Sequence, residues 1–290
     1  MIMDKQNIGS MTAKGGFANE EDIKNKFLNW QSDTDAQKWL MQMGYRIEEI
    51  RVLESQVVPT SISWNRASDF GISDDNFIET KQFKKADLRV NIKTRLDSIV
   101  HTENISLKKA NFDHSLNRPN DYNQVDKRPV DTYRNMWSFN DNVSDWLKLF
   151  TGEYEPKNFR DRINYGKLKN AKRIFLNEIP ETELWEIVDF FSKNKTSIIR
   201  DVLKGRGVLD SDWMLVTENV KADAQCEDGC HPKWVLRAMD YVLDYYSEGV
   251  VELSKFGSLT IGKITMQRKG GTPDPTSLQF KFHPLELFDN

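Results

Sequence analysis

The spacing of apolar residues predicts helices in the first part of the chain and again in its middle. After Asn19, which is suited to capping a helix, Ile23 and Phe27 recur at the spacing of one helical face. A second short helix is expected over residues 36–43, and Gly44 supplies a stop for it. Further helical patterns cover residues 130–137, 143–150, 181–204 and 234–246.

Shorter apolar runs, several of them alternating, predict strands between and after these helices. Residues 87–92 and 104–108 are expected to form two core strands joined as a hairpin. A strand is expected to start at Phe77 and Ile78. The polar stretch 111–128 is too long for an ordinary connector, which indicates a functional loop. Further strands are expected at residues 46–58, 213–216, 250–253, 259–266 and 278–282.

The order of these elements predicts a mixed α/β fold of the α+β kind. Helices come first, a small mixed sheet follows, and more helices precede a strand-rich C-terminal quarter. We expect a flexible N-terminus over residues 1–16 and a single domain over residues 17–290.

Composition is that of an ordinary globular protein, with 29% charged and 38% hydrophobic residues in a chain of 290. No apolar run reaches the roughly 18 residues of a membrane span, and the first residues lack the apolar core of a secretion signal. We therefore expect a cytoplasmic protein without membrane contacts. The net charge of −3 means that nucleic-acid binding would have to rest on local basic patches.

Asp87 and Lys108 carry the most suggestive chemistry. They belong to the two neighbouring predicted strands, which would bring them to the same edge of a sheet. Ser106 lies two positions before Lys108, so its side chain shares that face of the strand. Mg²⁺ takes oxygen ligands and needs only one or two carboxylates, which makes Asp87 the candidate ligand. Lys108 would orient a water molecule and offset negative charge that develops on a phosphate.

This arrangement resembles the PD-(D/E)xK nucleases, and in particular type II restriction endonucleases. Ala86 and Asp87 stand for the Pro-Asp of their motif, and Ser106-Leu107-Lys108 stands for the (D/E)xK. The departure is Ser106, which replaces an acidic residue and favours a water-mediated role over direct metal ligation. The helix after Gly15-Gly16 is similar to N-terminal helices that bring an additional Glu, here Glu20, to the active site.

The resemblance implies a central mixed β-sheet flanked by helices, with C-terminal β-rich recognition elements. It places the catalytic core in about residues 17–150 and DNA recognition in about residues 151–290. The implied activity is Mg²⁺-dependent hydrolysis of double-stranded DNA at a short specific sequence, by an enzyme whose system includes a cognate DNA methyltransferase. A palindromic target often pairs with a two-fold homodimer, although a monomer can cut such a target in separate steps.

Contacts with DNA are expected from the polar loop, a basic stretch over residues 157–173 and the C-terminal strands. Arg, Lys, Gln and Asn are the side chains that usually read base edges, and cations also hold the phosphates. The candidate DNA-binding residues are Asn123, Gln124, Lys127, Arg128, Arg160, Arg162, Arg173, Gln267, Arg268, Lys269, Gln279 and Lys281.

The residues alone leave other readings open. Asp87 and Lys108 also fit a plain surface ion pair, and Glu20 fits a charge that complements a helix dipole. A repair or structure-specific nuclease would use the same core, and Ser106 would also suit a DNA-binding protein that has lost its chemistry. Cys226 and Cys230 supply at most half of a zinc site, so two structural thiols are favoured.

Overall fold

The computed structural model describes residues 18–96, 99–113, 118–119, 122–219, 233–269 and 276–288. These residues belong to two compact units that alternate along the chain. The first unit draws on Met1–Asp121, Lys204–Val242 and His283–Asn290, and the second on Tyr122–Leu203 and Leu243–Phe282. The expected boundary near residue 150 therefore falls inside the second unit, and the segment 1–16 lies outside the described residues.

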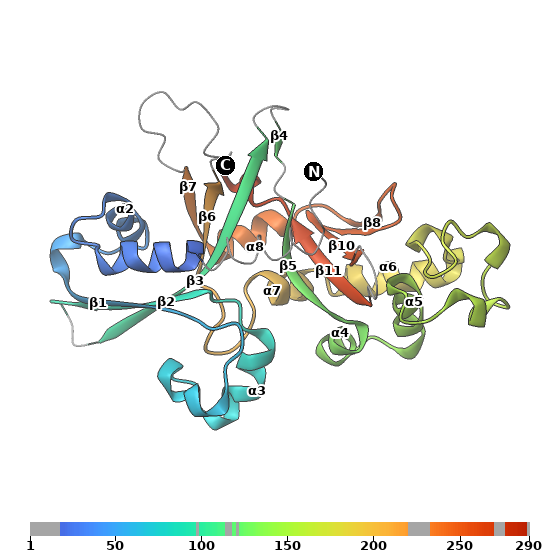
Figure 1. The fold of residues 1–290 in the computed structure, drawn as a ribbon, viewed down its shortest axis with the longest axis horizontal. Helices are drawn as coiled ribbons and strands as arrows, with labels where there is room; N and C mark the ends of the chain where they lie inside the picture. The colour runs from blue at the N-terminus through green and yellow to red at the C-terminus, as the bar shows by residue number, and fades with distance from the viewer. Residues whose placement is uncertain are drawn as a thin grey trace, which may run out of the picture. The chain divides into compact units, whose positions relative to one another are not determined.

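A six-stranded mixed sheet forms the centre of the first unit (Figure 1). Its order is β1-β2-β3-β6-β7, with β4 paired to β3. The strands are β1 (Ile50–Val57), β2 (Leu88–Thr94), β3 (Val100–Asp113), β4 (Arg118–Pro119), β6 (Trp213–Asn219) and β7 (Trp234–Ala238). All neighbours run antiparallel except β3 and β6, which are parallel. Leu88, Val90 and Ile92 of β2 alternate with half-exposed residues, which is the pattern of a strand with one fully buried face.

Two helices cover one face of this sheet. The first spans residues 18–28 and the second, α2, spans Thr34–Gln42. Asp33 caps α2 by accepting hydrogen bonds from the backbone amides of Asp35 and Ala36. Ile23, Phe27 and Trp39 pack into a core with apolar residues of β2, β3, β6 and β7. This packing holds the start of the first helix in register with the strands.

A second, smaller core lies under α3 (Asp74–Phe83) and the segment before it. Phe70 and Phe77 pack there with Ala86 and Leu209. Short 3-10 turns complete the first unit: η1 (Ile47–Glu49), η2 (Trp64–Arg66), η3 (Ser68–Phe70) and η7 (Pro284–Phe288). This core anchors the chain immediately before Asp87.

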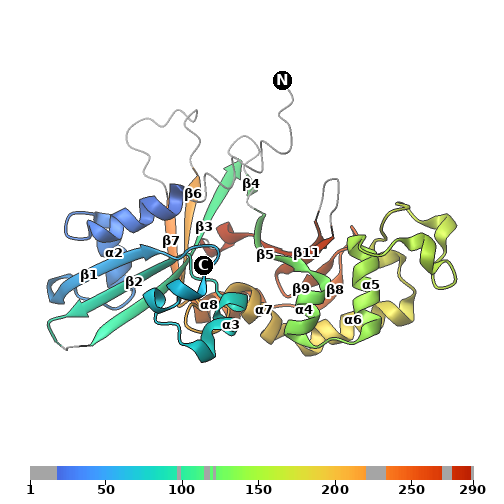
Figure 2. The ribbon, with the colours of Figure 1, turned by 60° about the horizontal axis from the view of Figure 1, so that its bottom comes forward.

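The second unit contains a five-stranded antiparallel sheet in the order β5-β11-β10-β9-β8 (Figure 2). Its strands are β5 (Asn123–Pro129), β8 (Val251–Leu253), β9 (Leu259–Ile261), β10 (Ile264–Arg268) and β11 (Ser277–Phe282). The helices are α4 (Val130–Trp137), α5 (Asp141–Thr151), α6 (Glu181–Lys193) and α7 (Lys195–Leu203), with η4 (Pro156–Phe159), η5 (Tyr165–Lys167) and η6 (Leu176–Glu178). Helix α8 (Met239–Ser247) carries the chain from the first unit into the second. Leu278, Phe280 and Phe282 of β11 are fully buried, so one face of the sheet is apolar.

The mixed α/β fold with a central mixed sheet and flanking helices is confirmed, as are the helices near the N-terminus and the β2–β3 hairpin. Among the described residues, no helix is long and apolar enough to span a membrane.

Three local predictions are wrong. Phe77 and Ile78 lie in α3 rather than a strand, because Phe77 packs into the small core while Ile78 stays 75% exposed. The stretch 234–246 divides into β7 and α8, because β6 pairs antiparallel with residues 234–238. The expected loop 111–128 contains the end of β3 and most of β5, because β5 pairs with β11.

Candidate active site

Asp87 lies between α3 and β2, with its backbone fixed on both sides. Its amide donates to the carbonyl of Ile105 over 2.9 Å, and its carbonyl accepts from the amide of Val58 over 2.9 Å. Leu88 then pairs with Ile105 in the β2–β3 ladder. The carboxylate of Asp87 is therefore presented to the stretch of β3 that contains Ser106, Leu107 and Lys108.

One oxygen of the Asp87 carboxylate is surrounded by donors from β3. Oδ2 accepts from the amide of Leu107 at 2.8 Å, from the hydroxyl of Ser106 at 3.3 Å and from the ammonium of Lys108 at 3.4 Å. Within the described part of the chain, Oδ1 takes no hydrogen bond. The side chain is 31% exposed, so the carboxylate is reached by solvent.

Lys108 is held by three acceptors. Besides Asp87, its ammonium donates to Ser106 Oγ at 2.9 Å and to the Leu107 carbonyl at 3.0 Å. Ser106 is only 2% exposed, so its hydroxyl is enclosed between Asp87 and Lys108 and acts as a bridge between them. Ser106 thus connects Asp87 and Lys108 in the fold, and its role in catalysis stays a prediction.

Glu20 reaches the same group from the helix over residues 18–28. Burial and the charge of Asp87 raise the pKa of Glu20 from 4.5 to about 7, against the opposing charges of Lys108 and Lys84. The neighbouring Asn19 accepts a hydrogen bond at 3.1 Å from the hydroxyl of Thr217 on β6. This contact ties the start of the helix to the strand next to Lys108. The sequence does not predict that Thr217, Lys84 and the side chain of Asn19 lie near this group. Only the folded chain brings these residues to the site.

The carboxylate oxygens of Asp87 and Glu20 suit a hard cation that keeps several waters. Two carboxylates lie close enough to raise one pKa by repulsion, and Asp87 Oδ1 is unused. A cation near both would relieve that repulsion. Among the described residues, no three His, Cys, Asp or Glu side chains form a closed metal cage. Mg²⁺ fits such a site, because it binds through one or two carboxylates and retains water.

Three other acidic residues near these strands in the sequence, Glu79, Glu103 and Asp212, have contacts elsewhere or are exposed. Glu103 accepts from the hydroxyl of Tyr45 at 2.5 Å and from the indole of Trp213 at 2.8 Å. Asp212 accepts from the amide of Asn104 at 2.9 Å, and Glu79 is exposed on α3. Cys226 and Cys230 lie outside the described residues, so their roles stay predictions.

The family model of R.HinP1I restriction endonuclease matches residues 77–288. The match covers well over half of the chain and includes Asp87, Ser106 and Lys108. The chain belongs to the R.HinP1I restriction endonuclease family. The predicted resemblance to type II restriction endonucleases is thereby confirmed, and DNA is the implied substrate. Glu20 precedes the matched region. Curated proteins give no match to this chain.

The R.HinP1I family chain also gathers predicted DNA-binding residues on one face of its five-stranded sheet. Gln279 of β11 lies between Lys127 of β5 and Gln267 of β10 in the strand register. In the next row, Lys281 pairs with Gln124 on one side and Thr265 on the other. Side chains alternate along a strand, so this polar face is opposite the buried Phe280 and Leu278. Segments remote in sequence thus form one polar surface, which we call the polar sheet face: Gln124, Lys127, Gln267, Gln279 and Lys281.

Gln279 and Lys281 lack the partners that would make them purely structural. Gln279 is 7% exposed, yet its amide makes no hydrogen bond with another described residue. Burial lowers the pKa of Lys281, whose ammonium lies 5.3 Å from the centre of the Tyr122 ring. No carboxylate of the described chain forms an ion pair with this lysine. Neither side chain is therefore held by a hydrogen bond or an ion pair within the described residues, and a DNA contact by either stays a prediction.

Other predicted DNA-binding residues have contacts within the second unit. Arg268 donates to the Ile174 carbonyl at 2.5 Å, and its guanidinium lies 4.0 Å from the centre of the Phe175 ring. Burial and the charge of Arg173 lower the pKa of Arg268 to about 10. These contacts give Arg268 a structural role, and a DNA contact by it stays a prediction.

The remaining candidates differ in the contacts that they make within the protein. Arg173 donates to the Lys269 carbonyl at 2.7 Å, and Arg162 donates to Asn142 at 2.7 Å. Arg128 forms an ion pair with Asp126 at 3.0 Å. Arg160 is exposed and lies over the Tyr165 ring, and Asn123 lies in β5 opposite Phe282. Their roles in DNA binding stay predictions.

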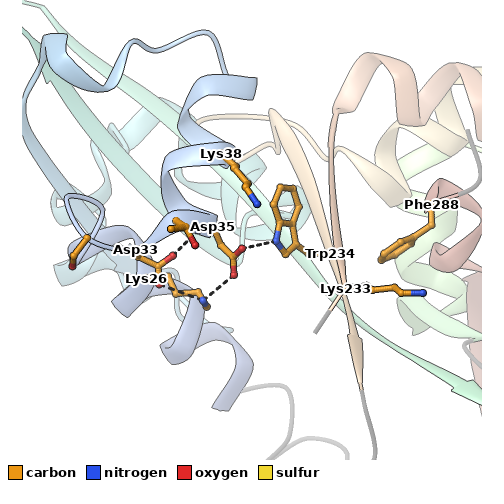
Figure 3. A pocket seen from close by; sticks show the side chains of 9 residues that line it. Lys26, Asp33, Asp35, Lys38, Lys233, Trp234 and Phe288 are labelled. Atoms are coloured by element: carbon orange, nitrogen blue, oxygen red, sulfur yellow. Dashed lines mark hydrogen bonds and ion pairs between the residues drawn. The ribbon is translucent and has the colours of Figure 1, made fainter. Parts of the chain in front are cut away.

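A pocket of about 590 Å³ lies between the two N-terminal helices and β7 (Figure 3). Its lining includes Lys26, Asp33, Asp35, Lys38 and Trp234, and none of the candidate catalytic residues. Asp35 accepts from the Trp234 indole at 3.0 Å and from Lys26 at 3.0 Å, as the dashed lines in Figure 3 show. The carboxylates of this pocket therefore serve to join helix, loop and strand.

Proposed function

We propose that this chain is a type II restriction endonuclease that hydrolyses double-stranded DNA at a short specific sequence with Mg²⁺. The observation that carries the proposal is the half-used carboxylate of Asp87. Three donors of β3 hold Oδ2, and Oδ1 remains open beside Glu20. The ammonium of Lys108 lies next to the Asp87 carboxylate, where it would meet the phosphate of the substrate. On this proposal, the chain is a nuclease of the PD-(D/E)xK superfamily.

Asp87 and Glu20 would hold the metal ion through carboxylate oxygens. Bound there, Mg²⁺ would polarise the phosphate and lower the pKa of a bound water. Ser106 supports this arrangement indirectly, since its enclosed hydroxyl sets the position of Lys108 relative to Asp87. Groups that orient a ligand in this way matter for metal affinity and activity although they do not touch the metal.

Lys108 would stabilise the transition state of hydrolysis. In the reaction the attacking water gives up a proton to solvent as its oxygen bonds to phosphorus, and the bond from phosphorus to the leaving oxygen breaks as that oxygen takes up a proton. Negative charge grows on the phosphate oxygens, and a fixed ammonium opposes it. Lys108 currently donates to three protein acceptors. When DNA binds, its ammonium would exchange one of them for a phosphate oxygen or the attacking water.

The polar sheet face would supply sequence recognition. Glutamine amides can pair with adenine edges, and lysine can donate to guanine, which are frequent contacts in the major groove. Gln267 and Gln279 lie side by side in the register, with Lys127 next to Gln279. A two-stranded or broader β-surface can enter the major groove. The cations would also attract the phosphate backbone of the duplex.

The partners implied by this function are a DNA duplex and a protective enzyme. A nuclease that cuts a short sequence also threatens the DNA of its own cell. We propose that a cognate DNA methyltransferase modifies the same sequence. A homodimer would match a palindromic target by two-fold symmetry, and stepwise cutting by a monomer would serve as well.

The test is cleavage of a plasmid of known sequence by the purified full-length chain. We expect discrete fragments with uniform ends when Mg²⁺ is present and intact DNA when EDTA replaces it. Fragments that start only at mismatches or lesions would instead identify a repair nuclease. Binding without cutting, with every divalent ion tried, would overturn the proposal and identify a DNA-binding protein that lacks the chemistry.

A further inference from the structure

Lys84 is a second lysine close to Asp87, at the C-terminal end of α3. Its amide donates to the Thr80 carbonyl at 2.9 Å, which closes the last turn of the helix. The next two amides, those of Lys85 and Ala86, both donate to the Leu209 carbonyl, at 3.0 and 3.1 Å. The backbone is therefore fixed from the end of α3 to the start of β2.

Gly205 shows how closely the two backbones approach at this point. Its φ of +82° lies in the left-handed region, and a Cβ there would come within 2.0 Å of the Phe83 carbonyl oxygen. Backbone thus packs on backbone directly beside Lys84. The fixed backbone sets the point from which the Lys84 side chain extends, three residues before Asp87.

The charge of Lys84 acts on the catalytic group, yet its ammonium has no direct partner. It interacts electrostatically with the carboxylates of Asp87 and Glu20 and with Lys108. The side chain is half-buried, and burial lowers its pKa although the two carboxylates act in the opposite direction. Within the described chain, the ammonium makes no hydrogen bond and no ion pair.

Lys84 and Lys108 consequently differ in what they can offer to DNA. Lys108 has three acceptors within the protein, whereas the three N–H groups of Lys84 are all unused. The two carboxylates offset part of the Lys84 charge at a distance, and its N–H groups remain available to an anionic oxygen that arrives with the substrate. The phosphate backbone of DNA supplies that oxygen.

We propose that Lys84 contacts the phosphate backbone at or next to the bond that is cut. This inference rests on the proposed function, and it assigns Lys84 to substrate binding rather than to the metal. A purely structural role would require Lys84 only to balance the charge of Asp87 and Glu20 in the folded protein. The two roles predict different effects on DNA binding.

The experiment compares the wild type with Lys84→Gln and with the matched control Lys81→Gln. Lys81 is exposed on the same helix, and its ammonium lies 5.8 Å from the centre of the Phe77 ring. The affinity for a DNA duplex is measured at several salt concentrations with Ca²⁺ in place of Mg²⁺. The slope of log K against log salt should fall by about 1 for Lys84→Gln and stay unchanged for Lys81→Gln.

Cleavage and stability complete the test. Lys84→Gln should slow single-turnover cleavage by about 10²-fold, as loss of one transition-state donor does, and Lys84→Arg should recover part of the rate. An unchanged salt slope for Lys84→Gln would overturn the inference, whether or not unfolding stability falls. The binding measurement does not depend on cleavage, so a wild type that binds DNA without cutting it would contradict the proposed function and still test Lys84.

Discussion

The ammonium of Lys108 lies 3.4 Å from Oδ2 of Asp87, across the gap between β3 and the start of β2. This distance is long for a strong ion pair, and the buried hydroxyl of Ser106 bridges the two groups with bonds of 3.3 and 2.9 Å. The direct attraction between the two charges is therefore weak, and the hydrogen bonds of Ser106 and the Leu107 carbonyl fix the position of Lys108. Such an arrangement leaves the lysine able to exchange an acceptor when substrate arrives.

Replacing Ser106 by Ala should lower the cleavage rate by about 10–100-fold, the range expected for a group that orients a metal ligand. The fold should survive, because Lys108 keeps its contacts with Asp87 and the Leu107 carbonyl. Single-turnover rates with Mg²⁺ measure the effect. Ser144→Ala is the control, since Ser144 is equally buried in the second unit and its hydroxyl has no partner. Equal rates for the two variants would remove Ser106 from the site.

Replacing Arg268 by Ala should mainly destabilise the second unit. The Ile174 carbonyl would lose its donor, which costs about 1–3 kcal/mol when the acceptor is left unsatisfied, and the contact with the Phe175 ring would be lost. Urea unfolding of the wild type and the variant measures this. Unchanged stability together with weaker DNA binding would instead restore Arg268 as a DNA-reading residue.

Replacing Gln279 by Ala should weaken discrimination between DNA sequences more than it weakens the stability of the fold. Its amide has no hydrogen-bond partner within the described residues, so truncation should cost only the packing of its buried side chain, about 1 kcal/mol. Loss of a bidentate contact with a base would cost about 1–3 kcal/mol of discrimination at one position of the target. Competition between the cognate duplex and single-base variants measures that discrimination. Wild-type discrimination by Gln279→Ala would exclude this residue from recognition.

Asp35 makes stability depend on pH. Burial alone would raise its pKa, but hydrogen bonds from Trp234 and Lys26 outweigh burial and lower the pKa below its usual 3.8. A carboxylate with a depressed folded-state pKa stabilises the fold above its unfolded pKa, and that contribution disappears as the pH falls through the folded pKa. Asp35→Asn should thus cost about 1 kcal/mol near neutral pH.

The difference in stability between the wild type and Asp35→Asn should shrink as the pH falls to about 3. Urea unfolding at several pH values provides the measurement. Asp33→Asn cannot serve as the control, because Asp33 also caps α2 and its loss would destabilise the helix. A difference that stays constant from neutral to acid pH would show that the charge of Asp35 contributes nothing.

The sequence predicts the strands of the site better than the segments around them. Apolar and polar residues alternate in 87–92 and 104–108, and the apolar residues of both segments, among them Val90 and Ile105, are buried. Residues 234–246 were expected to be one helix, since a short apolar run does not distinguish the two periods. Pairing with β6 decides the matter, and that partner is remote in sequence.

The same limit applies to the residues of the site. Asp87 directly precedes β2, and Ser106 and Lys108 lie on the adjacent β3, so a sequence pattern can bring them together. Lys84 is placed by the end of α3, and Thr217 by the parallel pairing of β6 with β3. Neither arrangement produces a pattern in the neighbouring sequence. Arg268 shows the converse, because nothing in its neighbourhood along the chain reveals that the Phe175 ring will cover it.

The cleavage rate of Asp87→Asn tests the central claim most directly. Asparagine keeps an oxygen that can accept from the Leu107 amide, so the fold and metal-free DNA binding should persist. The full-length variant, the wild type and the control Glu79→Gln, whose carboxylate is exposed on α3, would be compared on one duplex with Mg²⁺. We predict wild-type cleavage by Glu79→Gln and a loss of at least about 10²–10³-fold for Asp87→Asn. Wild-type cleavage by Asp87→Asn would contradict the account.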